Sequence, residues 1–159
     1  MHFSESLHPS LVSHIDELRV PVQRAEVEVH TAGGRRHAAI FLAPHASPED
    51  VFEDELPFFP AEEGGKIRFY ARSSLVSLAI GAGDAPPASL AALGVLYQAR
   101  RIAVTFCTGE VLQGTLMSPS GLTRTLDLVN QDGMSFAVHA EGKIHYVAKA
   151  HVQSIEELP

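Results

Sequence analysis

Apolar and polar residues alternate along two stretches of the chain, and this pattern predicts β-strands. In the first stretch Val27 and Val29 stand between polar residues, and Ile102, Val104 and Phe106 repeat the pattern in the second. Alternation with a period of two is typical of a strand that is buried on one face only. A glycine-containing turn follows each stretch and leads into a second predicted strand, at 37–43 and 111–118.

Helical spacing precedes each of these strand pairs. Apolar residues recur three or four positions apart, as Leu11, Ile15 and Leu18 in the first case and as Leu90, Leu93 and Leu96 in the second. Each strand pair is therefore expected to follow a short helix. A further single helical turn is predicted after the second strand, where Ser47 and Pro48 precede two acidic residues.

A glycine-containing hairpin and a last short strand follow each pair. We expect three-residue loops at 63–65 and 140–142, because that register places apolar residues opposite each other in both hairpins. In this register His139 and His145 share an exposed face of the second hairpin. The last strands are predicted at 75–79 and 152–156.

The chain also repeats itself at an offset of 77 residues. Residues 50–78 align without a gap on 127–155, with 7 of 29 positions identical. The identical positions include Gly65, Lys66 and Ile67, which match Gly142, Lys143 and Ile144. We interpret the repeat as a duplicated unit, with one domain at 1–80, a Gly- and Pro-rich linker at 81–88 and a second domain at 89–159.

Each unit therefore has a short helix followed by five short strands. Five strands in so short a segment are best closed into a small barrel, because closure removes most exposed strand edges. The expected fold class is mainly β, with two tandem five-stranded barrels that are each preceded by a short α-helix.

This order resembles the Sm-like fold, a five-stranded SH3-like barrel with an N-terminal helix. Sm-like domains end in a strand that carries a basic residue followed by spaced aliphatic residues. Residues 71–78 and 148–155 are similar, with Arg72 and Lys149 at the basic position. Residues 106–116 resemble the strand–Gly–strand pattern of the family, and Asp127-Leu128-Val129-Asn130 echoes the motif that lies near bound uridine.

The resemblance implies two functions. Sm-like barrels associate edge to edge into rings, so a tandem chain would form a homo-oligomer such as a trimer acting as a pseudo-hexamer. RNA binding is the alternative, and the resemblance implies Arg72, Lys149, Asp127 and Asn130 as the contacting residues.

Charge and composition narrow the class of partner. The net charge is −7 and the isoelectric point about 5.7, which argues against a DNA-binding protein held by a broad basic field. Residues 1–80 carry −5 and residues 81–159 carry −2, so anion binding is favoured in the second unit. The single cysteine, Cys107, excludes an intramolecular disulfide framework. No apolar segment is long enough to span a membrane, and we expect a cytoplasmic protein.

Motifs of enzymes and cofactor sites are absent from the sequence. Nucleophile elbows, phosphate-binding loops and zinc motifs do not occur, and no cofactor is expected. A metal site at His139 and His145 is geometrically conceivable but weakly supported, because the first unit has Glu62 and Arg68 there. An arginine pair at 100–101 gives only a weak match to cyclic di-GMP-binding barrels.

We therefore expect a non-catalytic, bacterial-type cytoplasmic binding or assembly module. Its expected partner is another copy of the chain or a different protein. RNA binding is one alternative, and a small-ligand or metal-binding regulator is another.

Overall fold

The computed structural model describes residues 22–81, 97–119 and 124–159. The helices predicted from residues 11–18 and 90–96, and residues 82–88 of the predicted linker, lie outside this part. The first half contains β1 (Gln23–Thr31), β2 (Gly34–Leu42), α2 (Asp50–Glu53), β3 (Phe58–Glu63), β4 (Lys66–Ala71), η2 (Arg72–Ser74) and β5 (Leu75–Gly81). The second half contains β6 (Tyr97–Phe106), β7 (Val111–Pro119), α3 (Thr125–Val129), β8 (Ser135–Ala140), β9 (Lys143–Ala148), η5 (Lys149–His151) and β10 (Val152–Glu157). The prediction of a mainly β fold is confirmed.

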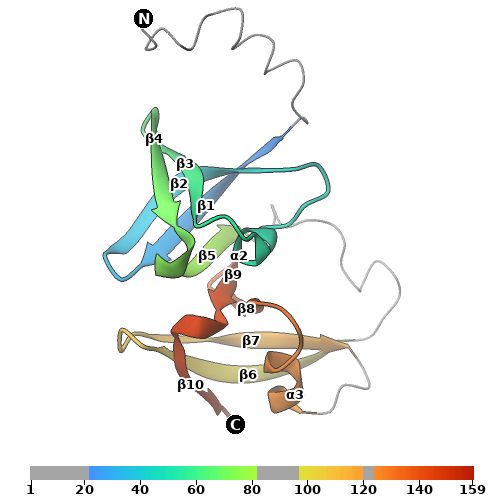
Figure 1. Cartoon of the computed structure of the whole chain (residues 1–159). Helices are drawn as coiled ribbons and strands as arrows, with labels where there is room; N and C mark the ends of the chain where they lie inside the picture. The colour runs from blue at the N-terminus through green and yellow to red at the C-terminus, as the bar shows by residue number, and fades with distance from the viewer. Residues whose placement is uncertain (1–21, 82–96, 120–123) are drawn as a thin grey trace, which may run out of the picture.

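The ten strands form one antiparallel sheet in the order β10-β6-β7-β8-β9-β5-β1-β2-β3-β4. Within this order each half contributes five consecutive strands, and β5 of the first half pairs with β9 of the second. The sheet is open, and within the described residues no ladder between β4 and β5 or between β9 and β10 closes either half. The two outer strands, β4 and β10, lie at opposite ends of the molecule (Figure 1).

The predicted three-residue hairpin loops are wrong, because both loops have two residues. Lys66 pairs with Glu63, and Lys143 pairs with Ala140. In the second loop both residues have positive φ, 55° at Glu141 and 73° at Gly142, which is the conformation of a type I′ turn. The right-handed twist of the strands favours this turn, so glycine at the second loop position sets the register.

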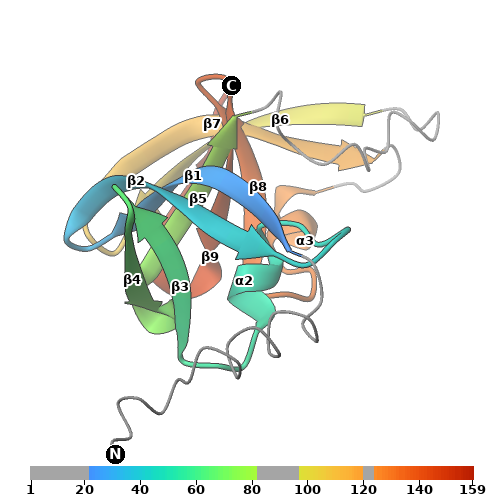
Figure 2. The same ribbon diagram turned by 90° about the horizontal axis from the view of Figure 1, so that it is seen from above.

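Each half buries its own hydrophobic core. The first core is formed mainly by Val27, Val29, Ile40, Phe59, Tyr70, Leu75 and Leu78. The second is formed mainly by Ile102, Val104, Phe106, Leu112, Phe136, Val138 and Val147. The alternating residues of β1 and β6 thus face inward as their pattern predicts. The short helices α2 and α3 lie on the same side of the molecule (Figures 1 and 2).

Elements of the two halves recur at the offset seen in the sequence. The bounds of β3, β4 and η2 become those of β8, β9 and η5 when 77 is added to each number. One loop contact recurs as well: the Arg72 amide donates to the Pro57 carbonyl at 2.8 Å, and the Lys149 amide donates to the Met134 carbonyl at 2.9 Å. The sequence offset therefore corresponds to equivalent places in the backbone.

No described helix combines the length and the apolar character that a membrane crossing requires.

Candidate functional site

The two halves meet in the ladder between β5 and β9, which we call the junction. Residues Ser77–Gly81 pair with Lys143–Val147 in antiparallel register. One face of this ladder carries a buried apolar cluster made of Ile80, Ile144 and Tyr146, with Phe52 of α2 packed against it. The halves are therefore held by both backbone pairing and side-chain burial.

A polar group crosses the junction on the opposite face of the ladder. His30 of β1 is 1% exposed, and its Nδ1 lies 3.4 Å from the Ser77 hydroxyl. Its Nε2 lies 3.3 Å from one carboxylate oxygen of Glu110, and the other oxygen accepts a 2.8 Å hydrogen bond from Arg35. We call these four residues the junction clamp. It joins the turn between β6 and β7 to β1 and β2 of the first half.

The ionisation of the clamp follows from burial and from Arg35. Burial lowers the pKa of His30, and the nearby Arg35 lowers it further, although Glu110 acts in the opposite direction. The hydrogen bond from Arg35 in turn lowers the pKa of Glu110. At neutral pH the clamp therefore contains a neutral imidazole beside a carboxylate–guanidinium pair.

The clamp has the residue types of a hydrolytic Ser–His–acid triad, but its geometry does not suit catalysis. Ser77 is 2% exposed and lies within the junction ladder, so a substrate cannot reach its hydroxyl. A nucleophile must be accessible to the bond that it attacks. The clamp therefore positions the two halves.

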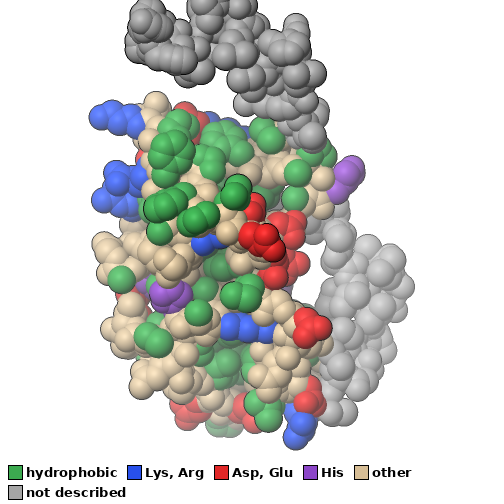
Figure 3. Space-filling model, in the orientation of Figure 1, with side chains coloured by type: hydrophobic (Ala, Val, Ile, Leu, Met, Phe, Trp, Pro, Cys, Tyr) green, Lys and Arg blue, Asp and Glu red, His purple; other side chains and the backbone are tan. Residues whose placement is uncertain are grey.

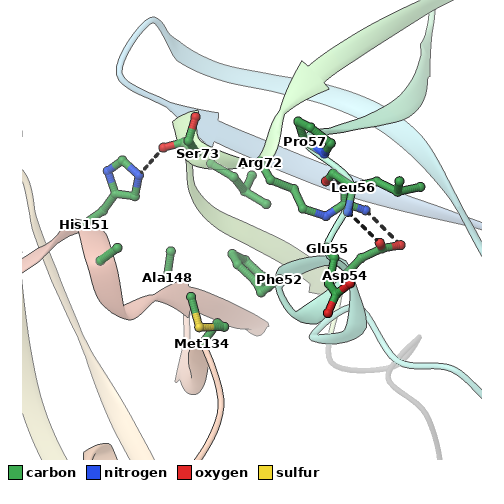
Figure 4. A pocket seen from close by; sticks show the side chains of 12 residues that line it. Phe52, Asp54, Glu55, Leu56, Pro57, Arg72, Ser73, Met134, Ala148 and His151 are labelled. Carbon is green, nitrogen blue, oxygen red and sulfur yellow. Dashed lines mark hydrogen bonds and ion pairs between the residues drawn. The ribbon is translucent and has the colours of Figure 1, made fainter.

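A cavity of about 440 Å³ lies beside the junction (Figure 4). Its apolar lining includes Phe52, Leu75, Met134 and Ala148, and thus comes from both halves. Cavities of this size hold small molecules when a few free polar groups orient the ligand. Here His151 Nε2 is hydrogen-bonded to the Ser73 carbonyl oxygen at 2.7 Å, and Arg72 donates to the Val51 carbonyl oxygen. These polar groups are therefore engaged in hydrogen bonds within the chain.

Arg72, one of the residues predicted to bind RNA, lines this cavity. Its guanidinium donates 2.6 Å hydrogen bonds to the carbonyl oxygens of Val51 and Leu56 and forms an ion pair with Asp54 at 3.3 Å. It also lies 5.4 Å from the centre of the Phe59 ring. Arg72 therefore holds α2 and the following loop on the first core, which leaves its donors committed within the chain.

The other predicted RNA contacts belong to the second half. Lys149 donates from Nζ to the Gln131 carbonyl oxygen, so the second basic position also holds a neighbouring loop. Asp127 accepts hydrogen bonds of 3.0 and 2.8 Å from Arg124, and Asn130 is an exposed residue at the end of α3. RNA binding by these residues remains a prediction, with the two basic side chains engaged in backbone contacts.

The two histidines proposed as metal ligands do not share a face. In the observed register His139 is opposite Ile144 and His145 is opposite Val138, which places the two rings on opposite sides of the hairpin. The expectation of a common exposed face is wrong because it used the three-residue loop. Among the described residues no group of three potential metal ligands is found.

His145 is nevertheless unusual. It is buried, and neither ring nitrogen has a well-formed hydrogen bond among the described residues. Burial lowers its pKa, with Arg35 and Lys143 acting in the same direction and Glu28 against them. It is therefore a neutral ring facing the charged groups of the first half across the junction.

Sequence reasoning missed the junction and its clamp. His30 reads as an outward residue in the alternating pattern of β1, because the pattern shows only that one face is polar. The face is covered by the second half of the same chain, and Phe106 lies edge-on to His30 with ring centres 5.6 Å apart. Only the tertiary contact distinguishes this histidine from a solvated one.

Comparisons with known proteins add no identification: no family model, curated protein or solved structure matches this chain.

Proposed function

We propose that this chain is a non-catalytic assembly module made of two repeats of an Sm-like five-stranded barrel. In this proposal each repeat binds the next through the edges of its strands. One such contact is made inside the chain, at the junction, and the others are made between chains. The recurrence of β3, β4 and η2 at an offset of 77 residues supports the duplication on which the proposal rests.

The observation that carries the proposal is a difference in exposure between equivalent strands. In the second half, Ile144 and Tyr146 of β9 are 9% and 8% exposed, because β5 and α2 cover them. In the first half, Ile67 and Phe69 occupy the same places on β4 and are 54% and 70% exposed. The first half therefore has a surface equivalent to the one that the second half uses at the junction, and among the described residues no strand pairs beside it.

The same difference holds for the partner strand. All residues of β5 from Leu75 to Ile80 are buried, whereas β10, its equivalent, has four exposed residues and two half-buried ones. Strands β4 and β10 are the outer strands of the sheet. Within the described residues, the chain thus has one unpaired equivalent of each strand of its own junction.

An edge strand that avoids association usually carries charges and little apolar surface. Strand β4 does carry Lys66 and Arg68, but Phe69 is the most exposed large apolar residue in the described part of the chain. Hydrophobic side chains gather on the visible face of the first half (Figure 3). Phe58 of the neighbouring strand β3 is also 58% exposed. A patch of this kind favours an interaction surface over a protected edge.

The proposed contact is head to tail, because β4 and β10 are different surfaces. Repeated head-to-tail contacts give a closed ring if the rotation between neighbours closes, and a filament if it does not. The resemblance to Sm-like rings favours closure, and three chains would supply six repeats.

Light scattering coupled to size-exclusion chromatography tests this function. We expect the mass to rise with concentration from the 17.1 kDa of one chain to a defined multiple, about 51 kDa for three chains. A mass of one chain across the whole accessible range of concentrations would reject the assembly function.

A further inference from the structure

We infer that β10 of one copy of this chain pairs with β4 of the next in one register, set by an ion pair between Arg68 and Glu156. This inference rests on the proposed assembly function and specifies its contact. Strands β4 and β10 are the outer strands of the described sheet, and the register observed between β5 and β9 indicates which of their side chains would face each other.

The register is obtained by moving each junction pair by one repeat. At the junction Leu78 is opposite Tyr146, and Ala79 is opposite His145. Subtracting 77 from the β9 residues and adding 77 to the β5 residues gives Phe69 opposite Ile155 and Arg68 opposite Glu156. A shift by one residue would move every side chain to the other face, so these pairs define the register.

One face of the transferred ladder is apolar at its centre. Ile155 is half-buried on β10 and would lie opposite Phe69 as Leu78 lies opposite Tyr146 at the junction. Burial of a phenylalanine side chain contributes substantially to association, because apolar surface leaves water. The neighbouring pair, Ile67 with Glu157, is less favourable, since Glu157 replaces the isoleucine found at the junction and accepts a 2.7 Å hydrogen bond from Thr125.

The other face is charged, with opposite signs on the two strands. Glu156 would lie directly opposite Arg68 and diagonally opposite Lys66, and all three side chains are exposed. Arg68 Nε already lies 3.1 Å from a carboxylate oxygen of Glu63, so Glu156 would add a second carboxylate to this guanidinium. Opposite charges in directly opposed positions stabilise a strand pair, and like charges destabilise it. At the junction the corresponding pair is Ala79 with His145, which carries no charge at neutral pH.

The two contacts are therefore chemically different. The junction is held by apolar burial and a buried polar clamp, whereas the contact between chains depends partly on an exposed ion pair. Salt weakens the attraction between exposed charges, and the screening length falls from about 10 Å at 0.1 M to about 3 Å at 1 M. Association between chains should consequently weaken as salt is added, while the junction stays closed.

A charge-reversal cycle tests the inferred pair in the full-length chain. We expect Arg68→Glu and Glu156→Arg each to weaken association by about tenfold, because each places like charges in opposition. The double variant Arg68→Glu/Glu156→Arg should recover most of the loss. The control is Asp132→Lys, which changes an exposed charge in the loop between α3 and β8, outside both outer strands, and should leave association unchanged.

Crosslinking tests the register independently. In a Cys107→Ser background, Phe69→Cys with Ile155→Cys should give disulfide-linked oligomers on mild oxidation, since directly opposed Cβ atoms lie about 5 Å apart. The matched control moves one cysteine by one position, as Phe69→Cys with Ser154→Cys, which keeps Glu156 in place and should crosslink much less.

The outcomes separate this inference from the proposed function. A monomer at all concentrations rejects both. An oligomer that is indifferent to both charge reversals, or that crosslinks equally in the shifted control, overturns the inferred register and leaves assembly standing. Loss in each reversal with recovery in the double variant supports both.

Discussion

Two isoleucines, 77 positions apart in the sequence, provide an internal comparison of the two halves of the chain. Ile67 and Ile144 each follow a lysine at the start of a strand after a two-residue turn. The same change, Ile→Ala, removes the same atoms from the same local structure at both sites. Differences in strand propensity therefore cancel, and only the environment of the side chain remains.

The structure predicts unequal costs for the two substitutions. Ile144 is 9% exposed within the apolar cluster of the junction, and truncation of a buried isoleucine costs about 2–5 kcal/mol. Ile67 keeps 54% of its surface in water, so its truncation in a single chain should cost about 1 kcal/mol or less. The free energies of unfolding of the two variants should thus differ by roughly 2 kcal/mol.

Urea unfolding measures this difference. Dilute protein at high salt keeps the chain monomeric, so that Ile67 is not covered by another copy. An unchanged dependence of the unfolding free energy on urea concentration shows that the unfolded state is the same in each variant. At higher concentration and low salt, Ile67→Ala should weaken association. Equal losses of stability for the two variants would refute the difference in burial between β4 and β9.

Three further predictions test other parts of the structure. Burial lowers the pKa of His30 and of His145, so the unfolded chain binds protons at these residues before the folded chain does. The free energy of unfolding should therefore level off well above pH 6.5 and fall below it, by up to about 1.4 kcal/mol per pH unit for each histidine. Replacing both residues with glutamine should reduce this slope. Gly114→Ala should destabilise the chain by about 1–3 kcal/mol, because the added Cβ would lie 2.6 Å from the His139 carbonyl oxygen. In the same urea assay Gly33→Ala should have a much smaller effect, since its Cβ makes only an ordinary 3.6 Å contact. Arg72→Ala should lower stability by about 1–3 kcal/mol through the loss of its loop contacts, and a loss of RNA affinity without any loss of stability would instead support a direct role in binding.

The strands could be predicted well from the sequence because each half has its own alternating pattern. The second strands, predicted at 37–43 and 111–118, are observed at Gly34–Leu42 and Val111–Pro119. The last strands begin at Leu75 and Val152 as predicted. Local alternation and glycine-containing turns determine these elements, and both are visible in a single sequence.

The hairpin register could not be predicted in the same way. Matching apolar residues across the hairpin favours a three-residue loop, which would place Phe136 opposite Tyr146. In the structure Tyr146 is instead opposite Ala137, and it belongs to an apolar cluster that includes Ile80 and Phe52 from the other half of the chain. The error arises because the partner of this face lies across the junction, beyond the hairpin itself.

The candidate site also depends on contacts between segments that are distant in the sequence. Identical isoleucines at 67 and 144 look alike in the sequence, and only the placement of β5 against β9 makes one buried and the other exposed. The basic residues at 72 and 149 could be located from the repeat, but their bonds to backbone carbonyl oxygens depend on how the neighbouring loops fold.

Hydrogen exchange of the intact chain at two concentrations tests the central claim most directly. If β4 and β10 pair between chains, their amides should exchange more slowly in concentrated than in dilute protein, whereas the amides of β5 and β9 should be equally protected in both. Exchange in β4 and β10 that is fast and independent of concentration would contradict the account.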